Sequence, residues 1–200
     1  MDIYLATGNA HKLQEFQEIF RAAGVTAHLH GAGELGGMPQ VEENGKTFAE
    51  NARIKAAALL EKAPLDAWVL ADDSGLQVDA LGGAPGVYSA RYAGAHGGDL
   101  GNTQKLLREL KDISDEERGA QFACHLCFMN ARGDEYFFEG VCRGRIAREL
   151  SGQGGFGYDP VFIPEGFGKS FAELDGAQKN ALSHRGKAAQ KLADFLAGRA

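Results

Sequence analysis

No apolar run in these 200 residues approaches the ~20 residues that a membrane-spanning helix needs. The first residues, Met1 to Leu13, lack the basic start and long apolar core of a secretory signal. Cysteine is scarce as well: three residues, an odd number, suit reduced thiols better than a disulfide framework. A basic excess is missing too, since the net charge is −6, which disfavours general nucleic-acid binding. We therefore expect a cytoplasmic protein that binds neither a membrane nor nucleic acid.

The composition that is present is that of a folded chain. Apolar residues make up 44% and charged residues 24%, close to the globular average. Glycine is frequent, with 28 residues, and such an excess often marks backbone that turns sharply or approaches a ligand closely. No repeat and no linker-like stretch interrupts the chain, so we expect a single domain over residues 1–200.

Strand and helix patterns alternate along the chain. The predicted strands are Asp2–Ala6, Val25–His30, Trp68–Ala71, a weak one at Leu76–Leu81, and Ala120–Met129 with Glu135–Cys142 as a hairpin that Arg143–Glu149 extends. The predicted helices are His11–Ala23, a run from a Thr47/Glu50 capping box to Lys62, Asn102–Leu110 and Lys179–Ala197, with a turn at Asp72–Gly75. This order predicts an α/β fold with a mixed central sheet flanked by helices, in two lobes around a cleft.

The first candidate site is the turn Thr7, Gly8, Asn9, Ala10, His11 and Lys12, between the first strand and the first helix. A helix N-terminus offers unpaired N–H groups and a positive dipole end, and Lys12 adds a cation, so the turn favours an anion. It lacks the Walker spacing, so a kinase or ATPase gains no support. The alternative is an ordinary turn in which Asn9 caps the helix.

Two acidic pairs form the second candidate. Glu42 and Glu43 precede a helix, and Asp72 and Asp73 end a buried strand. Ligands of open α/β sheets sit beyond the carboxyl ends of the strands, and adjacent buried carboxylates are costly unless a cation balances them. Mg²⁺ is the economical cation, because it accepts carboxylate, phosphate and water oxygens. The alternative is that these residues are helix caps and solvated turn residues.

Two further candidates lie near the end of the chain. The loop Gly154–Pro160 places Phe156 and Tyr158 among glycines, which suits stacking on a base, and Asp159 could accept from a ring N–H. Lys179, Ser183, His184 and Arg185 supply donors for a keto oxygen or a phosphate. The alternatives are a packing corner for the loop and a solvated helix face for the donors.

The pair Cys124 and Cys127 has the Cys-x-x-Cys spacing of a redox or metal motif. Both residues fall within an alternating strand, however, where they would point to opposite faces. We therefore interpret them as buried packing residues.

Taken together, these motifs resemble those of the inosine triphosphate pyrophosphatase family, in the family's order and over nearly the whole chain. They are Thr-Gly-Asn-x-x-Lys at 7–12, Glu-Glu-Asn-Gly at 42–45, Glu-Asn-Ala-x-x-Lys at 50–55, Ala-Asp-Asp-Ser-Gly at 71–75, Gly-Gly-Ala-Pro-Gly at 82–86, Tyr-Ser-Ala-Arg-Tyr at 88–92, Gly-Gly-Phe-Gly-Tyr-Asp-Pro at 154–160 and Ser-His-Arg at 183–185. The resemblance implies a homodimer that hydrolyses deaminated purine nucleoside triphosphates (ITP, dITP, XTP) to the monophosphate and pyrophosphate, clearing them from the nucleotide pool.

The resemblance also implies roles for single residues. Asp73 would be the general base and a Mg²⁺ ligand, with Glu42 as the second acidic ligand and Glu43 as the alternative. The implied substrate contacts are Thr7, Gly8, Asn9, Ala10, His11, Lys12, Lys55 and Ser74, with Phe156, Gly157, Tyr158, Asp159, Lys179, His184 and Arg185 around the base.

Two other functions stay open on the residues alone. A related pyrophosphatase for modified pyrimidine triphosphates would need a pocket without a purine-sized stacking loop. A non-catalytic nucleotide-binding module would bind triphosphate without turnover, although the four acidic residues at 42, 43, 72 and 73 argue against it.

Overall fold

Three long strands carry most of the sheet in the computed structural model, which describes residues 1–94 and 96–198. Its sheet strands and α-helices are, in chain order, β1 (Asp2–Leu5), α1 (Ala10–Ala22), β2 (His28–Gly31), α2 (Phe48–Leu60), β3 (Trp68–Val78), α3 (Gly98–Glu109), β4 (Gly119–Asn130), β5 (Glu135–Ile146), β6 (Phe162–Pro164), α4 (Gly176–Leu182) and α5 (His184–Leu196). The strand order is β2-β1-β3-β4-β5-β6. Because β1 is parallel to β2 and β3, whereas β5 is antiparallel to β6, the sheet is mixed, as the sequence predicts. None of the described helices is long and apolar enough to cross a membrane.

The chain divides into two compact units, and β3, β4 and β5 contribute residues to both. Unit 1 comprises Met1–Asp73, Cys124–Gly140 and the residues from Arg185 onward, and unit 2 comprises Ser74–Ala123 and Val141–His184. Each unit has a hydrophobic core of its own. Two of the boundaries between the units fall inside sequence motifs. The boundary after Asp73 falls inside Ala-Asp-Asp-Ser-Gly, and the boundary after His184 falls inside Ser-His-Arg.

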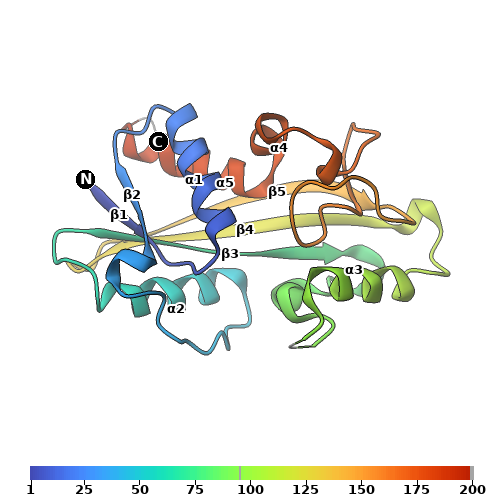
Figure 1. Cartoon of the computed structure of the whole chain (residues 1–200), viewed down its shortest axis with the longest axis horizontal. Helices are drawn as coiled ribbons and strands as arrows, with labels where there is room; N and C mark the ends of the chain where they lie inside the picture. Colours follow the sequence, from blue (N-terminus) through green and yellow to red (C-terminus); the bar gives the residue numbers. More distant parts are fainter. Residues whose placement is uncertain (95, 199–200) are drawn as a thin grey trace. The chain divides into compact units, whose positions relative to one another are not determined.

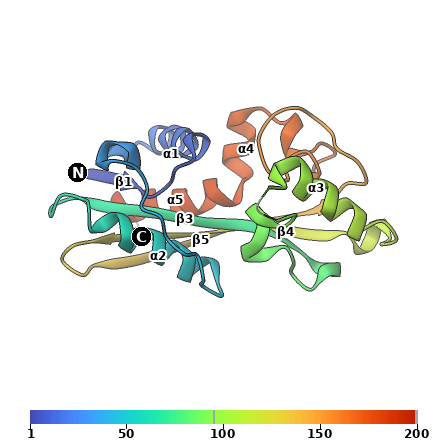
Figure 2. The same ribbon diagram turned by 60° about the horizontal axis from the view of Figure 1, so that its bottom comes forward.

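In unit 1, helices cover both faces of the sheet: α1 and α5 lie on one face and α2 on the other (Figure 1), as the turned view of Figure 2 also shows. Successive residues of a strand point to opposite faces. Leu70 of β3 accordingly packs with α1 and α5, whereas Val69 and Ala71 pack with α2. The same alternation sends Asp72 and Asp73 to opposite faces of the sheet.

The strand that begins at Trp68 continues as β3 to Val78, so the turn predicted at Asp72–Gly75 is wrong. The polar residues stay in the strand because both carboxylates are paired with cations of the protein. Beyond them, Leu76 and Val78 are fully buried in the core of unit 2, and the Leu76 N–H donates to Ser89 Oγ at 2.9 Å. Tertiary partners thus override a turn-like composition.

The predicted capping box at the start of α2 is confirmed. Thr47 Oγ1 accepts from the Glu50 N–H at 3.2 Å, and Glu50 Oε2 accepts from the Thr47 N–H at 3.3 Å. These two bonds fix the first turn and therefore the register of the helix. In that register Asn51 and Lys55, four residues apart, lie on one face of α2.

Two other helix predictions need correction. The single helix predicted over Lys179–Ala197 is two helices, because Ser183 is extended, with φ −66° and ψ 155°, and separates α4 from α5. The first of them also begins earlier, after the cap Asp175. In unit 2, α3 begins at Gly98 rather than at Asn102.

The cysteines are free and buried, as expected for packing residues. Cys124 packs with α1 and α5, and Cys127 packs with α2, so the two thiols lie on opposite faces of β4. Burial raises the pKa of Cys127 to about 12, with a further contribution from Glu135. Cys142 belongs to the core of unit 2. The Cys-x-x-Cys spacing therefore brings no thiol pair together.

Candidate active site

The turn between β1 and α1 is held by its own side chains. Thr7 Oγ1 accepts from the Asn9 N–H at 3.1 Å, and Asn9 caps α1 by accepting from the His11 N–H at 2.9 Å. Gly8, Ala10 and His11 are exposed, and a Cβ at Gly8 would meet no atom within 4 Å. Capping by Asn9 is thus confirmed, and it is compatible with an anion approaching the helix N-terminus.

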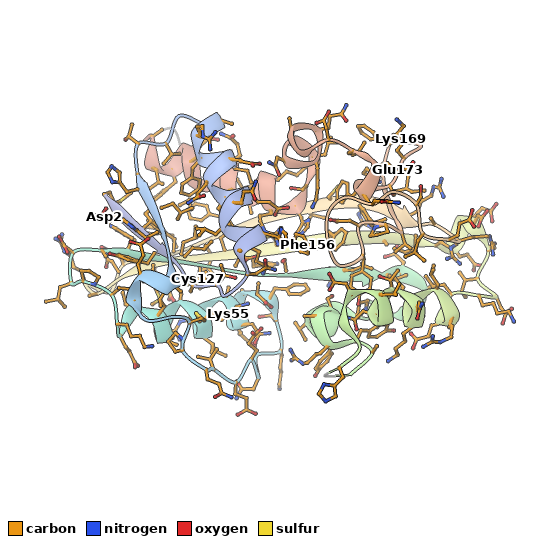
Figure 3. The ribbon with its side chains drawn as sticks, viewed as in Figure 1. Asp2, Lys55, Cys127, Phe156, Lys169 and Glu173 are labelled. Carbon is orange, nitrogen blue, oxygen red and sulfur yellow. The ribbon has the colours of Figure 1, made fainter. Side chains whose placement is uncertain are left out.

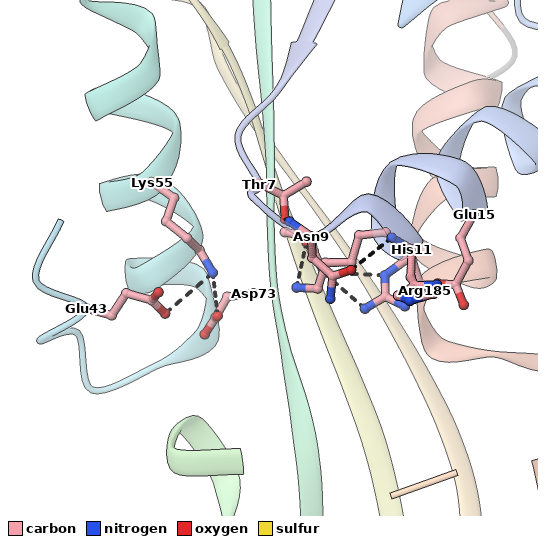
Figure 4. Close-up of polar contacts among 10 residues, drawn as sticks. Thr7, Asn9, His11, Glu15, Glu43, Lys55, Asp73 and Arg185 are labelled. Atoms are coloured by element: carbon pink, nitrogen blue, oxygen red, sulfur yellow. Dashed lines mark hydrogen bonds and ion pairs between the residues drawn. The ribbon is translucent and has the colours of Figure 1, made fainter. Parts of the chain in front are cut away.

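Asp72 is a buried carboxylate between two cations. Its Oδ1 accepts from Lys12 Nζ at 2.9 Å, and its Oδ2 accepts from Arg185 Nη2 at 3.3 Å. Burial alone would raise the pKa of Asp72, but the charges of Lys12 and Arg185 hold it well below its usual range. The buried Arg185 guanidinium also donates to Glu15, on the same side of β3 (Figure 4). Protein cations therefore balance Asp72, where the sequence suggested a metal.

The side chain of Asp73 lies on the opposite face of β3 and points toward α2. Its Oδ1 accepts from Lys55 Nζ at 2.6 Å, and its Oδ2 accepts from Asn51 Nδ2 at 3.4 Å. Burial raises the pKa of Asp73, Lys55 opposes this, and the carboxylates of Asp72 and Glu43 add to the increase. A largely buried carboxyl with a raised pKa has the properties of a general base.

The acidic turn before α2 reaches the same cluster through Glu43. Glu43 Oε2 lies 3.5 Å from Lys55 Nζ, so the ammonium group stands between Glu43 and Asp73 (Figure 4). Burial would lower the pKa of Lys55, but the nearby carboxylates raise it, and the group stays charged. Glu42 is exposed. The structure thus brings Glu43 to Asp73, although the sequence favoured Glu42.

In unit 2, Lys179 of α4 meets two residues of the glycine-rich loop. Its Nζ donates to Asp159 Oδ2 at 2.8 Å and lies 4.9 Å from the centroid of the Phe156 ring, which is labelled in Figure 3. The same Asp159 oxygen accepts from the Phe156 N–H at 2.8 Å. Lys179 and Asp159 are both buried. The Phe156 ring and the Lys179 ammonium are therefore held together, in a cation–π contact.

The tip of this loop is bound to α3. Gly157 has a left-handed φ of 62°, a region that favours glycine. Its N–H donates to Asp99 Oδ2 at 2.7 Å, and its carbonyl accepts from Thr103 Oγ1 at 3.3 Å. Both polar backbone groups of Gly157 are thus engaged by one helix, which orders the loop rather than leaving it mobile.

Tyr158 does not offer an exposed ring, contrary to the expectation from the sequence. It is 4% exposed, it packs in the core of unit 2, and its hydroxyl donates to the Ser89 carbonyl at 2.8 Å. Of the two aromatic residues of the loop, Phe156 is the one with a partly exposed side chain.

The Ser-His-Arg motif divides between the two units. His184 stacks on Phe122 of unit 2, with ring centroids 4.7 Å apart and an interplanar angle of 10°. Arg185 lies in unit 1 with Asp72. Ser74, the first residue of unit 2, is partly buried in β3 beside Asp73.

Sequence reasoning assigned no role to Asn51, Glu15 or Asp99. Asn51 stands inside the Glu-Asn-Ala-x-x-Lys motif, and its spacing of four from Lys55 on a helix was an available signal. Glu15 and Asp99 had no such signal, because their partners lie 170 and 58 residues away.

The chain belongs to the Ham1 family, whose model matches residues 3–195. Among similar proteins, a dITP/XTP pyrophosphatase of Opitutus terrae is 49% identical over 199 residues, covering 98% of each chain. One of the same name from Clostridium perfringens is 48% identical, covering 97% of this chain and 96% of its own. The structure of a HAM1 protein from Coxiella burnetii matches with a TM-score of 0.89 and 42% identity, covering 99% of each chain. The resemblance seen in the sequence motifs is thereby confirmed.

Proposed function

We propose that this chain hydrolyses the deaminated purine nucleoside triphosphates ITP, dITP and XTP to the nucleoside monophosphate and pyrophosphate, with Mg²⁺ as cofactor. The names of the full-length relatives support this substrate class. In the structure, the proposal depends on one observation: the buried carboxylate of Asp73, with its raised pKa, lies beside Lys55 and Glu43. That cluster combines a base, a cation and a second carboxylate.

The phosphates would bind to unit 1. The open turn from Thr7 to Lys12 supplies a helix N-terminus, and Lys12 and Lys55 supply cations. An acidic protein needs such local positive charge, because the triphosphate chain of the substrate carries roughly four negative charges. In this arrangement Arg185 holds Asp72, and Asp72 in turn orients the Lys12 ammonium at the end of the turn.

A magnesium ion fits the cluster on the chemistry of its donors. Two carboxylates, of Asp73 and Glu43, already converge on one cation, the Lys55 ammonium. Mg²⁺ can take two carboxylates and complete its shell with phosphate and water oxygens. When bound, Mg²⁺ would offset phosphate charge. We propose Asp73 and Glu43 as its ligands, with Glu42 as the alternative.

The reaction assigned to Asp73 is proton acceptance from water. As the water oxygen forms a bond to the α phosphorus, the bond from that phosphorus to the oxygen bridging the α and β phosphates breaks, and pyrophosphate leaves with the electron pair. The water proton passes to the Asp73 carboxylate, which acts as the general base. Lys55, 2.6 Å from Asp73, keeps the carboxylate charged between turnovers.

The base would be recognised in unit 2. Phe156 offers a face for stacking, and the Lys179 ammonium, held by Asp159, is a donor for the 6-oxo group of hypoxanthine or xanthine. Adenine has an amino donor at this position, so the same ammonium disfavours ATP. We keep His184 and Arg185 as further donors at the base, although Arg185 also pairs with Asp72.

We further propose a cytoplasmic homodimer, as the resemblance to the inosine triphosphate pyrophosphatase family implies. Light scattering coupled to size-exclusion chromatography measures the molar mass directly. For a chain of 21.3 kDa, the dimer is expected at twice that mass, and a single 21.3 kDa species contradicts it.

The experiment for the proposed function is pyrophosphate release from a panel of triphosphates with Mg²⁺: ITP, dITP, XTP, the four standard ribonucleotides and modified pyrimidine nucleotides. We expect rapid release from the first three and turnover lower by roughly 100-fold or more from ATP, whose 6-amino group cannot accept from Lys179. Preference for a pyrimidine contradicts the purine pocket. Tight binding of ITP without turnover identifies a binding module and contradicts the enzyme.

A further inference from the structure

The Asn51 side chain is one of the few uncharged polar groups that are fully buried, at 0% exposure. It begins the Asn-Ala-x-x-Lys part of its motif on α2, directly after the capping box. Capping accounts for Glu50, and the proposed phosphate contact accounts for Lys55, but neither explains a buried amide at residue 51. Burying such an amide is costly unless its donor and acceptor both find partners.

The two ends of this amide have different partners. Asn51 Oδ1 accepts from the Gly45 N–H at 2.9 Å, and Asn51 Nδ2 donates to Asp73 Oδ2 at 3.4 Å. One side chain therefore joins the turn that carries Glu43 to the carboxylate that the proposed reaction uses as its base. All four residues belong to unit 1.

Close packing fixes this bridge. A Cβ on Gly45 would lie 2.6 Å from Asn51 Oδ1 and 2.8 Å from the Glu50 Cβ, so only glycine fits there. The Glu-Glu-Asn-Gly turn thus ends in glycine because the backbone must touch Asn51. Two sequence motifs that are separate in the chain meet at this amide.

The opposite oxygen of Asp73 is engaged from the same helix. Lys55 Nζ lies 2.6 Å from Asp73 Oδ1, and Lys55 stands one turn after Asn51 on the same face of α2. The carboxylate is therefore held at both oxygens, by a charged donor and by a neutral one. A carboxylate held in this way has one orientation toward the attacking water.

We propose that Asn51 is a positioning residue, which sets the orientation of the Asp73 carboxylate and fixes the Glu43 turn relative to it. The inference rests on the proposed function, which gives Asp73 its catalytic role. We expect the Nδ2 donor of Asn51, and not only the volume of its side chain, to support turnover.

The substitution Asn51→Asp separates the two ends of the amide. Aspartate is nearly isosteric and still accepts from the Gly45 N–H, but it cannot donate to Asp73 and places a like charge beside it. We expect kcat for ITP to fall by about 30-fold or more while KM changes by less than about threefold. Asn51→Ala, which removes both bonds without adding a charge, is expected to lower kcat by about 10-fold. Asn44→Ala, an exposed amide in the same turn, is the matched control and is expected to keep wild-type kcat.

A second measurement needs no turnover. If Asn51 and Asp73 are in contact, Asn51→Asp lowers the melting temperature by like-charge repulsion. Adding Asp73→Asn to that variant rebuilds an amide and a carboxylate with their places exchanged, so the melting temperature should recover by about 2–4 °C or more. The double variant is expected to remain inactive, because residue 73 is then an amide.

Different results would contradict the proposed function and the role of Asn51. A wild-type protein that releases pyrophosphate from none of the triphosphates contradicts the proposed function, whatever Asn51 does in the melting experiment. Wild-type kcat in Asn51→Asp, or no recovery of the melting temperature in the double variant, overturns the role of Asn51. If Asn51→Asp does not fold, the kcat of Asn51→Ala decides, and an unchanged value overturns the proposal.

Discussion

Asp72 and Asp73 are neighbours in sequence, yet their carboxylates lie on opposite faces of β3 and belong to different networks. Asp72 is enclosed by Lys12 and Arg185, and its pKa is held below the usual range. Asp73 faces Lys55, and burial raises its pKa. The alternation of a strand thus gives two adjacent aspartates opposite pKa shifts, downward for Asp72 and upward for Asp73, which we propose as the base.

The Asp72 network makes a prediction about stability. Asp72→Asn leaves the buried Arg185 guanidinium without one of its carboxylate partners, and we expect a loss of about 3–5 kcal/mol in the free energy of unfolding. Urea unfolding followed by circular dichroism measures it. The exposed Asp66→Asn is the matched control and should change the free energy by less than about 0.5 kcal/mol. A similarly small effect for Asp72→Asn would show that the network contributes nothing.

The lowered pKa of Asp72 sets the pH dependence of that effect. A carboxylate with a depressed folded-state pKa contributes stability above its unfolded value, about 3.9, and this contribution is lost as the pH falls through the folded value. The difference in unfolding free energy between wild type and Asp72→Asn should be constant from pH 8 to 5 and shrink below about pH 4. Unfolding curves at several pH values measure it, and a difference that grows on acidification contradicts the assignment.

Lys55 should weaken metal binding to the nucleotide-free protein. Its ammonium stands 2.6 Å from Asp73 and 3.5 Å from Glu43, where it competes with a divalent ion for both carboxylates. We expect Lys55→Met to tighten Mn²⁺ binding without nucleotide by about 10-fold or more, measured by isothermal titration calorimetry. Lys46→Met removes an exposed charge close to the acidic turn and serves as the control. Equal affinities in the two variants would remove Lys55 from this role.

Base selection should depend on the Lys179 ammonium rather than on Phe156. Phe156→Ala removes a stacking face and should reduce kcat/KM for ITP and ATP alike. The loss of transition-state stabilisation should be about 1–3 kcal/mol for each substrate. Lys179→Met alone would leave the buried Asp159 carboxylate without its ammonium partner. It is therefore best made together with Asp159→Asn and compared with Asp159→Asn alone. In that comparison the ratio of kcat/KM for ITP over ATP should fall about 10-fold. If the ITP/ATP ratio of kcat/KM falls in Phe156→Ala and not in the Lys179 comparison, Phe156 rather than Lys179 selects the base.

Local patterns were sufficient to predict much of the fold. The Thr47/Glu50 capping box, the apolar face of α1 and the alternation in β4 are properties of short stretches of sequence, and the structure has all three. The turn predicted at Asp72–Gly75 failed because its polar residues are stabilised by partners far away in the chain, such as Arg185, 113 residues on. No local pattern contains such information.

The candidate site was predictable as a set of residues more than as an arrangement. The family resemblance named Asp73, Lys55 and Lys179, but which cation pairs with which carboxylate depends on tertiary contacts. Glu43 and Glu42 are adjacent and chemically identical, and only the path of the turn, held by Asn51, distinguishes them. For the same reason the pairing of Arg185 with Asp72 could not be foreseen, and its role at the base stays a prediction.

If Asp73 directs water to the α phosphorus of a deaminated purine triphosphate, the oxygen of that water must appear in the monophosphate, and an isotope experiment can follow it. ITP is hydrolysed by the wild type in water enriched in ¹⁸O with Mg²⁺, and the products are separated and weighed by mass spectrometry; Asp73→Asn is run in parallel. We expect IMP carrying one ¹⁸O and unlabelled pyrophosphate, with turnover lowered by about 100-fold or more in Asp73→Asn. Label in the pyrophosphate, products IDP and phosphate, or wild-type turnover in Asp73→Asn would contradict it.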